Sequence, residues 1–178
     1  MRPDFLHKLG SDEFVSASDS GLQQALMLSS IILMYSSLDG AVNKMVAILL
    51  GVVPRKFLPA AKRRIVELKS VDCGEKIAED QRQGVLKHVE KRKLDTRLDV
   101  IADAMSNTRM SLALSDKSIR SRISTLKLWR DEIVHRDRFT VDHDDVNREL
   151  RRAYMEFGDM CLLFDIALLE MVNNCQFD

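Results

Sequence analysis

The sequence contains few of the residues that interrupt helices. Only 7 of its 178 residues are glycine and 3 are proline, and leucine, methionine, alanine, lysine and arginine are abundant. Tight turns depend on glycine and proline, whereas the abundant residues favour helix. The composition therefore predicts an all-α protein. With 46% hydrophobic and 30% charged residues, residues 1–178 are expected to form one folded domain.

Cysteine is also scarce, and Cys73, Cys161 and Cys175 stand far apart. An odd number of cysteines without a CxxC pair provides neither a disulfide framework nor the ligand spacing of a zinc site. We therefore expect reduced thiols in a cytoplasmic protein. The adjacent residues 142–145, DHDD, favour a capped loop over a metal site. The sequence indicates no metal and no cofactor.

Neither sign of charge is in excess, because 27 lysines and arginines balance 27 aspartates and glutamates. Basic residues do gather between residues 55 and 69, where Glu67 is the only acid. This segment is either a solvated helix face or a patch for RNA phosphates. The N-terminus lacks the apolar core of a signal peptide. Residues 22–38 carry no charge, but their serines and glutamines favour a core helix over a membrane span.

Hydrophobic periodicity and capping residues predict a bundle of about four principal helices with shorter ones between them. Asp19 or Ser20 is expected to cap the first long helix, Gly51 to stop it, and Gly40 to mark the close approach of another helix. The expected helices are 21–50, 59–69, 75–105 in two pieces around Asp95, 117–138 capped by Ser115 or Asp116, and 146–172 capped by Asp142 or Asp144, with a break at 72–74 and a connection at 107–115. Tyr35, Trp129, Tyr154, Leu162 and Ile166 are expected in the core.

The helix expected at 117–138 is strongly amphipathic. Its apolar residues recur at three- and four-residue steps: Ile119, Ile123, Leu126, Trp129, Ile133 and Val134. Near its end stand Arg130 and His135, separated by Asp-Glu-Ile-Val. The spacing alone decides nothing, because each of the four histidines follows an arginine by five or six residues. Only the pair of Arg130 and His135 lies late in an amphipathic helix.

These residue types suit RNA cleavage without a metal ion. Histidine titrates near neutral pH and can donate or accept a proton, while the guanidinium of arginine matches phosphate oxygens. Five residues turn a helix by about 140°, so Arg130 and His135 are not stacked. Asp131 is four residues before His135 and is therefore stacked with it. From this position Asp131 could orient the imidazole.

The motif resembles the Arg-x(4–6)-His motif of the HEPN superfamily, in which a small polar residue follows the arginine and an apolar pair precedes the histidine. The order of helices also resembles that family, and Asp39 stands near the place where many members carry a glutamate. Some members have a tyrosine two residues after the histidine, where this chain has Asp137. The resemblance covers most of the chain as architecture and about a dozen residues as a motif.

This resemblance implies a metal-independent endoribonuclease of the toxin or antiviral-defence type. Arg130, His135 and Asp131 would be catalytic, and Lys127, Arg136 and Arg138 would contact RNA phosphates. A homodimer would bring two histidines and two arginines into one composite site. The implied partners are RNA, a second copy, and an antitoxin or nucleotidyltransferase, with no membrane.

The alternative is a non-catalytic helical module that dimerises or holds a partner such as an antitoxin or a nucleotidyltransferase. Arg130, Asp131 and His135 would then be solvated residues near a helix end, where cations interact favourably with the helix dipole. RNA cleavage that depends on His135 separates the two hypotheses.

Overall fold

The computed structural model describes residues 12–71, 79–136, 141 and 143–175, with side chains for 21–71, 79–135, 141 and 144–173. These residues form seven α-helices, one 3₁₀ turn and no strand, which confirms the predicted all-α fold. In chain order the elements are α1 (Asp12–Val52), α2 (Pro54–Arg64), η2 (Val66–Leu68), α3 (Glu79–Glu90), α4 (Leu94–Ala104), α5 (Arg109–Ser115), α6 (Lys117–Arg136) and α7 (His143–Cys175).

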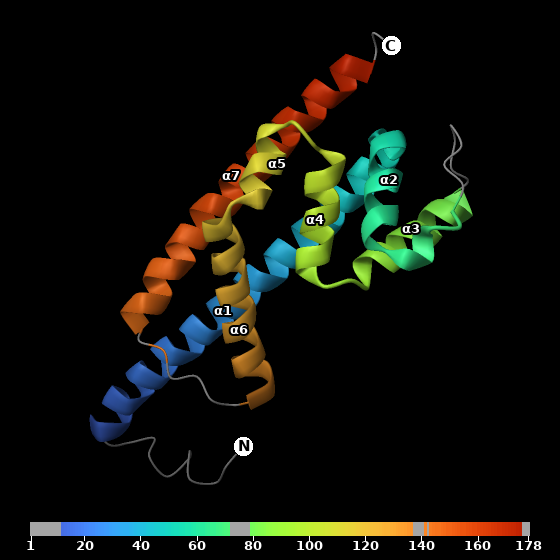
Figure 1. Ribbon diagram of the computed structural model, residues 1–178. Coiled ribbons are helices and arrows are strands. Elements are labelled where there is room, and N and C mark those ends of the chain that lie inside the picture. The colour runs from blue at the N-terminus through green and yellow to red at the C-terminus, as the bar shows by residue number, and fades with distance from the viewer. Residues whose placement is uncertain (1–11, 72–78, 137–140, 142, 176–178) are drawn as a thin grey trace.

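Two long helices, α1 and α7, lie side by side and run in the same direction (Figure 1). α6 crosses α1 on the side facing the viewer, and α2, α3 and α4 gather around the C-terminal half of α1 (Figure 1). The larger hydrophobic core lies among α1, α2, α4, α5 and α7. A smaller core joins the N-terminal half of α1 to α6 and α7 through Met27, Ile31, Leu126, Trp129, Val146 and Ala153. This smaller core fixes the end of α6 that carries the motif.

Helix α1 is longer than predicted at both ends. It begins at Asp12, so neither Asp19 nor Ser20 caps it, and it continues through Gly51 to Val52. The expected stop at Gly51 was wrong because Pro54 sets the boundary. A proline disfavours helical backbone in the residue before it, and Val53 accordingly has φ −130° and ψ 54°.

Two further predictions, one for Gly40 and one for the start of the next helix, were also wrong. Gly40 does not mark close approach, since no heavy atom of another helix lies within 4 Å of a β-carbon placed there. The next helix begins at Pro54 instead of Pro59 and ends at Arg64. Pro54 occupies the first turn, where a missing amide hydrogen costs nothing, and Pro59 lies inside the helix.

The predicted helix at 75–105 is divided, as expected, near Asp95: α3 ends at Glu90 and α4 begins at Leu94. The predicted break at 72–74 lies outside the described residues. The predicted connection at 107–115 was wrong, because Thr108 caps α5 by accepting a hydrogen bond from the Ser111 amide at 3.3 Å. Asn107 provides the turn with φ 68°, a conformation that asparagine tolerates better than most residues.

The capping prediction for the motif helix is confirmed at Asp116, whose Oδ1 accepts a hydrogen bond from the Ser118 amide at 2.7 Å. Hydrogen bonds from Ser118 lower the pKa of Asp116. The last helix begins at His143, earlier than predicted, so Asp144 lies inside its first turn and is not its cap. Asp142 is outside the described residues.

The burial predictions for aromatic and apolar residues hold only in part. Trp129 is buried and Tyr35 is half-buried, but Tyr154, Leu162 and Ile166 are 67%, 60% and 42% exposed. Periodicity identified apolar positions correctly but could not show which of them another element covers. On α7 these exposed residues alternate with the buried Ala153, Phe164 and Ala167, so one face of the helix is packed and another apolar face stays open.

Residues Gly21–Val52 of α1 are long and apolar enough to cross a membrane by length and composition. Within residues 22–38, where a core helix was predicted, Met27, Ile31 and Leu38 are at most 7% exposed, and other apolar residues such as Leu22, Leu26 and Leu33 are at least 60% exposed. A core helix can pass the same test, so length and composition alone do not show that α1 crosses a membrane.

Candidate functional site

α6 is held from both sides by arginines in its first half. Arg122 forms an ion pair with Glu149 of α7 at 3.1 Å and a second one with Glu156 of α7. Arg120 reaches the opposite way and donates to Asp99 of α4 at 2.8 Å. Together with the buried apolar face of α6, these contacts set the rotation of the helix. They therefore determine where the motif residues in its second half point.

Arg130 points from α6 toward α1. Its guanidinium carbon lies 5.7 Å from the centre of the Tyr35 ring, within the range of a cation–π interaction. Its Nη1 also donates to Asp131 Oδ1 at 2.7 Å, and 37% of its side chain is exposed. Arg130 is thus oriented by a ring on one side and a carboxylate on the other, with part of the guanidinium open to an incoming anion.

His135 lies one turn after Asp131 and is exposed. Among the described residues, no hydrogen bond or ion pair involves its imidazole, and Asp131 pairs with Arg130. The predicted role of Asp131 in orienting His135 therefore stays a prediction. The exposure of His135 leaves its imidazole open to a ligand or to a second copy of the chain.

Of the three residues predicted to contact RNA, only Lys127 has a described side chain. Lys127 is half-buried and lies one turn before Arg130 on α6. Arg136 is the last residue of α6, but its side chain is outside the described set, as is all of Arg138. The structure thus brings Arg130 and Asp131 together, and places Lys127 and His135 within a turn or two of them.

Three polar residues of α1, which the sequence analysis did not group, border this site. Tyr35, Asp39 and Asn43 follow one another at four-residue steps and therefore form one stripe along the helix. Asp39 and Asn43 both accept hydrogen bonds from Arg97 of α4. Arg97 is 4% exposed and is the only buried charged side chain in the described part of the chain. The spacing of polar residues at i, i+4 and i+8 along α1 is the signal that could have identified this stripe.

Burial raises the pKa of Tyr35, and the negative charges of Asp39 and Asp131 raise it further, while Arg130 and Arg97 lower it. Asp39→Asn or Asp131→Asn is therefore expected to lower the pKa of Tyr35, and Arg130→Met is expected to raise it. Ultraviolet titration of tyrosinate absorption in a Tyr154→Phe background measures this directly. If all three variants leave the Tyr35 titration unchanged, the charges do not surround the ring as described.

The raised pKa of Tyr35 also determines how its contribution to stability depends on pH. A phenol whose folded-state pKa is raised contributes stability below its unfolded pKa and loses it as pH rises through the folded value. The contribution of Tyr35 is therefore lost only at alkaline pH, above the ordinary pKa of 10.0. At neutral pH the ring is uncharged and acts as a platform for Arg130.

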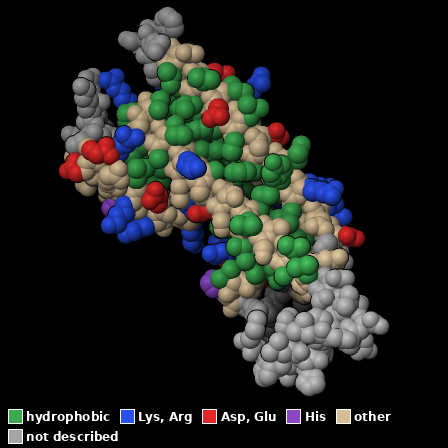
Figure 2. Space-filling view, turned by 180° about the vertical axis from the view of Figure 1, so that it is seen from behind, with side chains coloured by type: hydrophobic (Ala, Val, Ile, Leu, Met, Phe, Trp, Pro, Cys, Tyr) green, Lys and Arg blue, Asp and Glu red, His purple; other side chains and the backbone are tan. Residues whose placement is uncertain are grey.

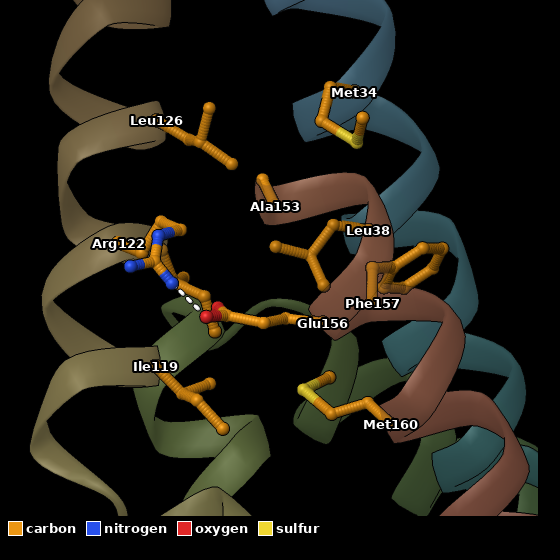
Figure 3. A pocket seen from close by; sticks show the side chains of 10 residues that line it. Met34, Leu38, Ile119, Arg122, Leu126, Ala153, Glu156, Phe157 and Met160 are labelled. Atoms are coloured by element: carbon orange, nitrogen blue, oxygen red, sulfur yellow. Dashed lines mark hydrogen bonds and ion pairs between the residues drawn. The ribbon is translucent and has the colours of Figure 1, made fainter. Parts of the chain in front are cut away.

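The cavity between α1, α6 and α7 is not a substrate site. It is lined by Met34, Leu38, Leu126, Phe157 and Met160, among others, and by the pair of Arg122 and Glu156 (Figure 3). Its volume of about 20 Å³ holds roughly one water molecule. A nucleotide cannot enter it, so an RNA ligand would have to bind on the surface.

Other candidate ligand sites are weaker. Among the described residues no group of three or more histidine, cysteine or acidic side chains is placed to hold a metal ion. In the basic segment, the Nε atoms of Arg64 and Arg63 lie 3.0 Å and 3.9 Å from Asp103 Oδ2. The tertiary structure therefore supplies acids that the segment itself lacks, which favours a solvated, ion-paired helix face over a phosphate patch.

Comparison with known proteins gives one family. The model of the RiboL-PSP-HEPN family matches residues 5–170. No curated protein and no solved structure matches the chain. The matched segment includes α6 with Arg130 and His135, and also the stripe on α1. Because the match covers most of the sequence, the chain belongs to the RiboL-PSP-HEPN family and therefore to the HEPN superfamily.

Proposed function

We propose that this protein is a metal-independent endoribonuclease of the toxin or antiviral-defence type that acts in the cytoplasm. Its membership in a HEPN family supports a nuclease-type role related to RNA. The observation that carries the proposal is the arrangement at the end of α6. Arg130 is held against Tyr35 with part of its guanidinium open, and the imidazole of His135, a little over a turn later, is exposed.

The proposed chemistry is an internal transfer of the phosphodiester. One His135 accepts the proton of a ribose 2′-hydroxyl, and the 2′-oxygen forms a bond to phosphorus. The bond to the 5′-oxygen breaks, and a second His135 donates a proton to that oxygen. Arg130 stabilises the negative charge that builds up on the phosphate oxygens. The products are a 2′,3′-cyclic phosphate and a 5′-hydroxyl.

Two proton transfers require two groups, and each chain supplies one motif histidine. A composite site that combines Arg130 and His135 of two copies meets this requirement. In this arrangement Lys127, Arg136 and Arg138 would contact phosphates that flank the cleaved bond. Asp131 would stay paired with Arg130, or it would orient His135 once a substrate phosphate binds Arg130 in its place.

The direct test is incubation of the purified protein with a mixture of structured and single-stranded RNAs in excess EDTA. Cleavage is expected to continue in EDTA and to leave 2′,3′-cyclic phosphate and 5′-hydroxyl ends, because the mechanism needs no metal ion. End-group analysis by mass spectrometry identifies the products. Cleavage that stops in EDTA, or that leaves 3′-hydroxyl ends, would contradict the mechanism.

The second candidate function is a non-catalytic module that holds a partner, such as an antitoxin or a nucleotidyltransferase. The observation that favours it is the large apolar surface left open on α1 and α7. A protein that binds a partner tightly but cleaves no RNA in the same assay would support this function over the nuclease.

A further inference from the structure

Arg120 joins α6 to the beginning of α4. Its Nη1 donates to the backbone oxygen of Asp95, in the first turn of α4, at 3.2 Å, and its Nη2 donates to Asp99 at 2.8 Å. Figure 1 accordingly shows the start of α4 beside α6. Lys127 is seven residues, or close to two helical turns, after Arg120 and therefore lies on the same side of α6. The side of α6 that carries Lys127 thus faces toward the start of α4.

Arg130 is connected to the same part of α4 through α1. Its guanidinium lies over the ring of Tyr35, and Asp39, one turn after Tyr35, accepts a hydrogen bond from Arg97 of α4. The amide of Arg97 donates to the backbone oxygen of Lys93 at 3.2 Å, so Lys93 lies one turn before Arg97. Direct contacts and single helical turns therefore link Arg130 to Lys93.

Lys93 belongs to a turn that is held in place. Residues 91–93 join α3 to α4, and Arg92 in the middle forms an ion pair with Glu67 of η2. The Arg92 amide also donates to the backbone oxygen of Val89 at 2.9 Å. Lys91 and Lys93 on either side of Arg92 are exposed, and among the described residues neither ammonium group forms a hydrogen bond or an ion pair. The turn therefore presents two lysine charges from a fixed backbone.

The aspartates near these lysines are engaged by arginines. Each of four aspartates in this region pairs with Arg97, Arg120 or Arg130: Asp39, Asp95, Asp99 and Asp131. On the turn itself, the exposed Glu90 precedes Lys91. Once the arginine pairs have formed, three lysines stand beside this one glutamate in the described part of the region: Lys91, Lys93 and Lys127. The space between α6 and the start of α4 therefore has a surplus of positive charge.

A second exposed basic cluster, on the first turns of α7, has no such surplus. Three arginines lie there among three acids: Arg148, Arg151 and Arg152, with Asp144, Asp145 and Glu149. Two of these arginines pair with an acid one turn away. Figure 2 shows that hydrophobic side chains gather along much of the reverse side of the molecule, which is turned away from the viewer in Figure 1. Phosphates are therefore attracted more strongly to the lysines beside α6 than to either of these surfaces.

We propose that an RNA strand cut at Arg130 and His135 continues past Lys127 and across the start of α4, where Lys91 and Lys93 contact its phosphates. This inference rests on the proposed nuclease function, because it takes Arg130 as the residue that binds the cleaved phosphate. Lysine suits such contacts, since its flexible stem carries a compact charge that needs no fixed geometry. Phosphate contacts carry no sequence information, so these lysines favour long RNA over short RNA without preferring a base.

The test measures binding of an unstructured RNA, a fluorescent oligouridylate, to the His135→Ala protein over a range of salt concentrations. Each phosphate contact to a single strand contributes about 0.7 to the slope of log affinity against log salt concentration. Adding Lys91→Gln and Lys93→Gln is therefore expected to make this slope less steep by about 1.4. The same loss of two contacts weakens binding roughly 10–30-fold at about 0.1 M salt.

Two matched variants separate the contact from net charge. Lys91→Arg with Lys93→Arg keeps both charges and should bind RNA as tightly as the parent protein. Arg148→Gln with Arg151→Gln removes two exposed charges from α7 and should leave the slope unchanged. Because Lys91 and Lys93 are exposed, the glutamine variant should keep the melting temperature of its parent. An unchanged slope in the lysine-to-glutamine variant, or equal changes in that variant and the α7 variant, would overturn the proposal.

The length of the substrate gives a second readout, which also separates this contact from the nuclease function. With His135 intact, KM for a long oligouridylate should be lower than for a uridine dinucleotide, and Lys91→Gln with Lys93→Gln should remove most of that difference. A chain that cleaves both RNAs with the same KM keeps the nuclease function and loses this contact. A chain that cleaves neither RNA, yet shows the expected change in salt slope, loses the nuclease function and keeps the contact.

Discussion

Replacing His135 with alanine is expected to lower the rate of RNA cleavage by about 10²–10⁴-fold, the usual contribution of a positioned acid or base. His135 is exposed, and among the described residues nothing hydrogen-bonds to it, so the variant should fold normally. The loss should appear in the turnover rate more than in RNA affinity, because the imidazole acts on protons. Single-turnover kinetics and RNA binding measured on the same protein separate the two effects.

Arg130→Ala is expected to lower cleavage by about 10²–10³-fold, because it removes the charge that stabilises the transition state. Arg130→Lys should recover little, since a lysine ammonium has no planar fork for phosphate oxygens and stacks less well on Tyr35. Asp131→Asn keeps the shape of the neighbour and removes its charge. Its effect on rate shows whether the carboxylate restrains Arg130 or assists the reaction.

The chain offers a matched control for both substitutions. Arg82 and His88 have nearly the same spacing as the motif pair, but they lie on α3, which does not contribute to the site. Arg82→Ala and His88→Ala should therefore leave cleavage unchanged. Equal losses in the two pairs would indicate a general effect of charge. Full activity in both His135→Ala and Arg130→Ala would remove the assignment of the site.

Removing the carboxylate of Asp39 should produce the largest loss of stability among single polar substitutions. Asp39→Ala leaves Arg97, which is 4% exposed, with Asn43 as its remaining hydrogen-bond acceptor. Breaking a buried ion pair from one side costs about 3–5 kcal/mol. Because 36% of the Asp39 side chain is exposed, we expect about 2–3 kcal/mol, or roughly 4–12 °C in melting temperature.

A surface ion pair of the same residue types provides the comparison. Asp103 accepts a hydrogen bond from Arg64 at 3.0 Å, but 45% of the Arg64 side chain is exposed. Asp103→Ala should therefore cost at most about 1 kcal/mol. Asp39→Leu combined with Arg97→Met, which replaces both charges with apolar groups, should be less destabilising than Asp39→Ala alone. Urea unfolding measures all three free energies. Equal losses for Asp39→Ala and Asp103→Ala would show that Arg97 does not depend on Asp39.

Local signals in the sequence predicted the secondary structure well where competing signals were absent. The scarcity of glycine and proline predicted an all-α chain, and the cap at Asp116 marked the start of α6. Errors arose where two signals competed. Gly51 and Pro59 looked like boundaries, but Pro54 alone controlled the backbone there, because its ring restricts Val53. Thr108 capped a helix too short for periodicity to reveal.

The motif could be selected from the sequence, but its surroundings could not. Arg130 and His135 were distinguished from three similar pairs by their place in an amphipathic helix. Nothing local to α6 indicated that Tyr35, almost a hundred residues earlier, would lie beneath the guanidinium of Arg130. Contacts between residues so far apart depend on how whole helices pack, and packing angles are not encoded in any short segment.

The sequence by itself determined the helical composition, the superfamily and the residues of the motif, because these depend on residue type and spacing along one helix. Only the tertiary structure decided that Asp39 neutralises a buried arginine, that Asp131 pairs with Arg130, and that half-buried Tyr35 borders the site while Tyr154 lies exposed on α7. The physical reason is that an apolar stripe shows that a helix face can be buried. Whether it is buried, and against which residues, depends on the lengths and crossing points of its neighbours.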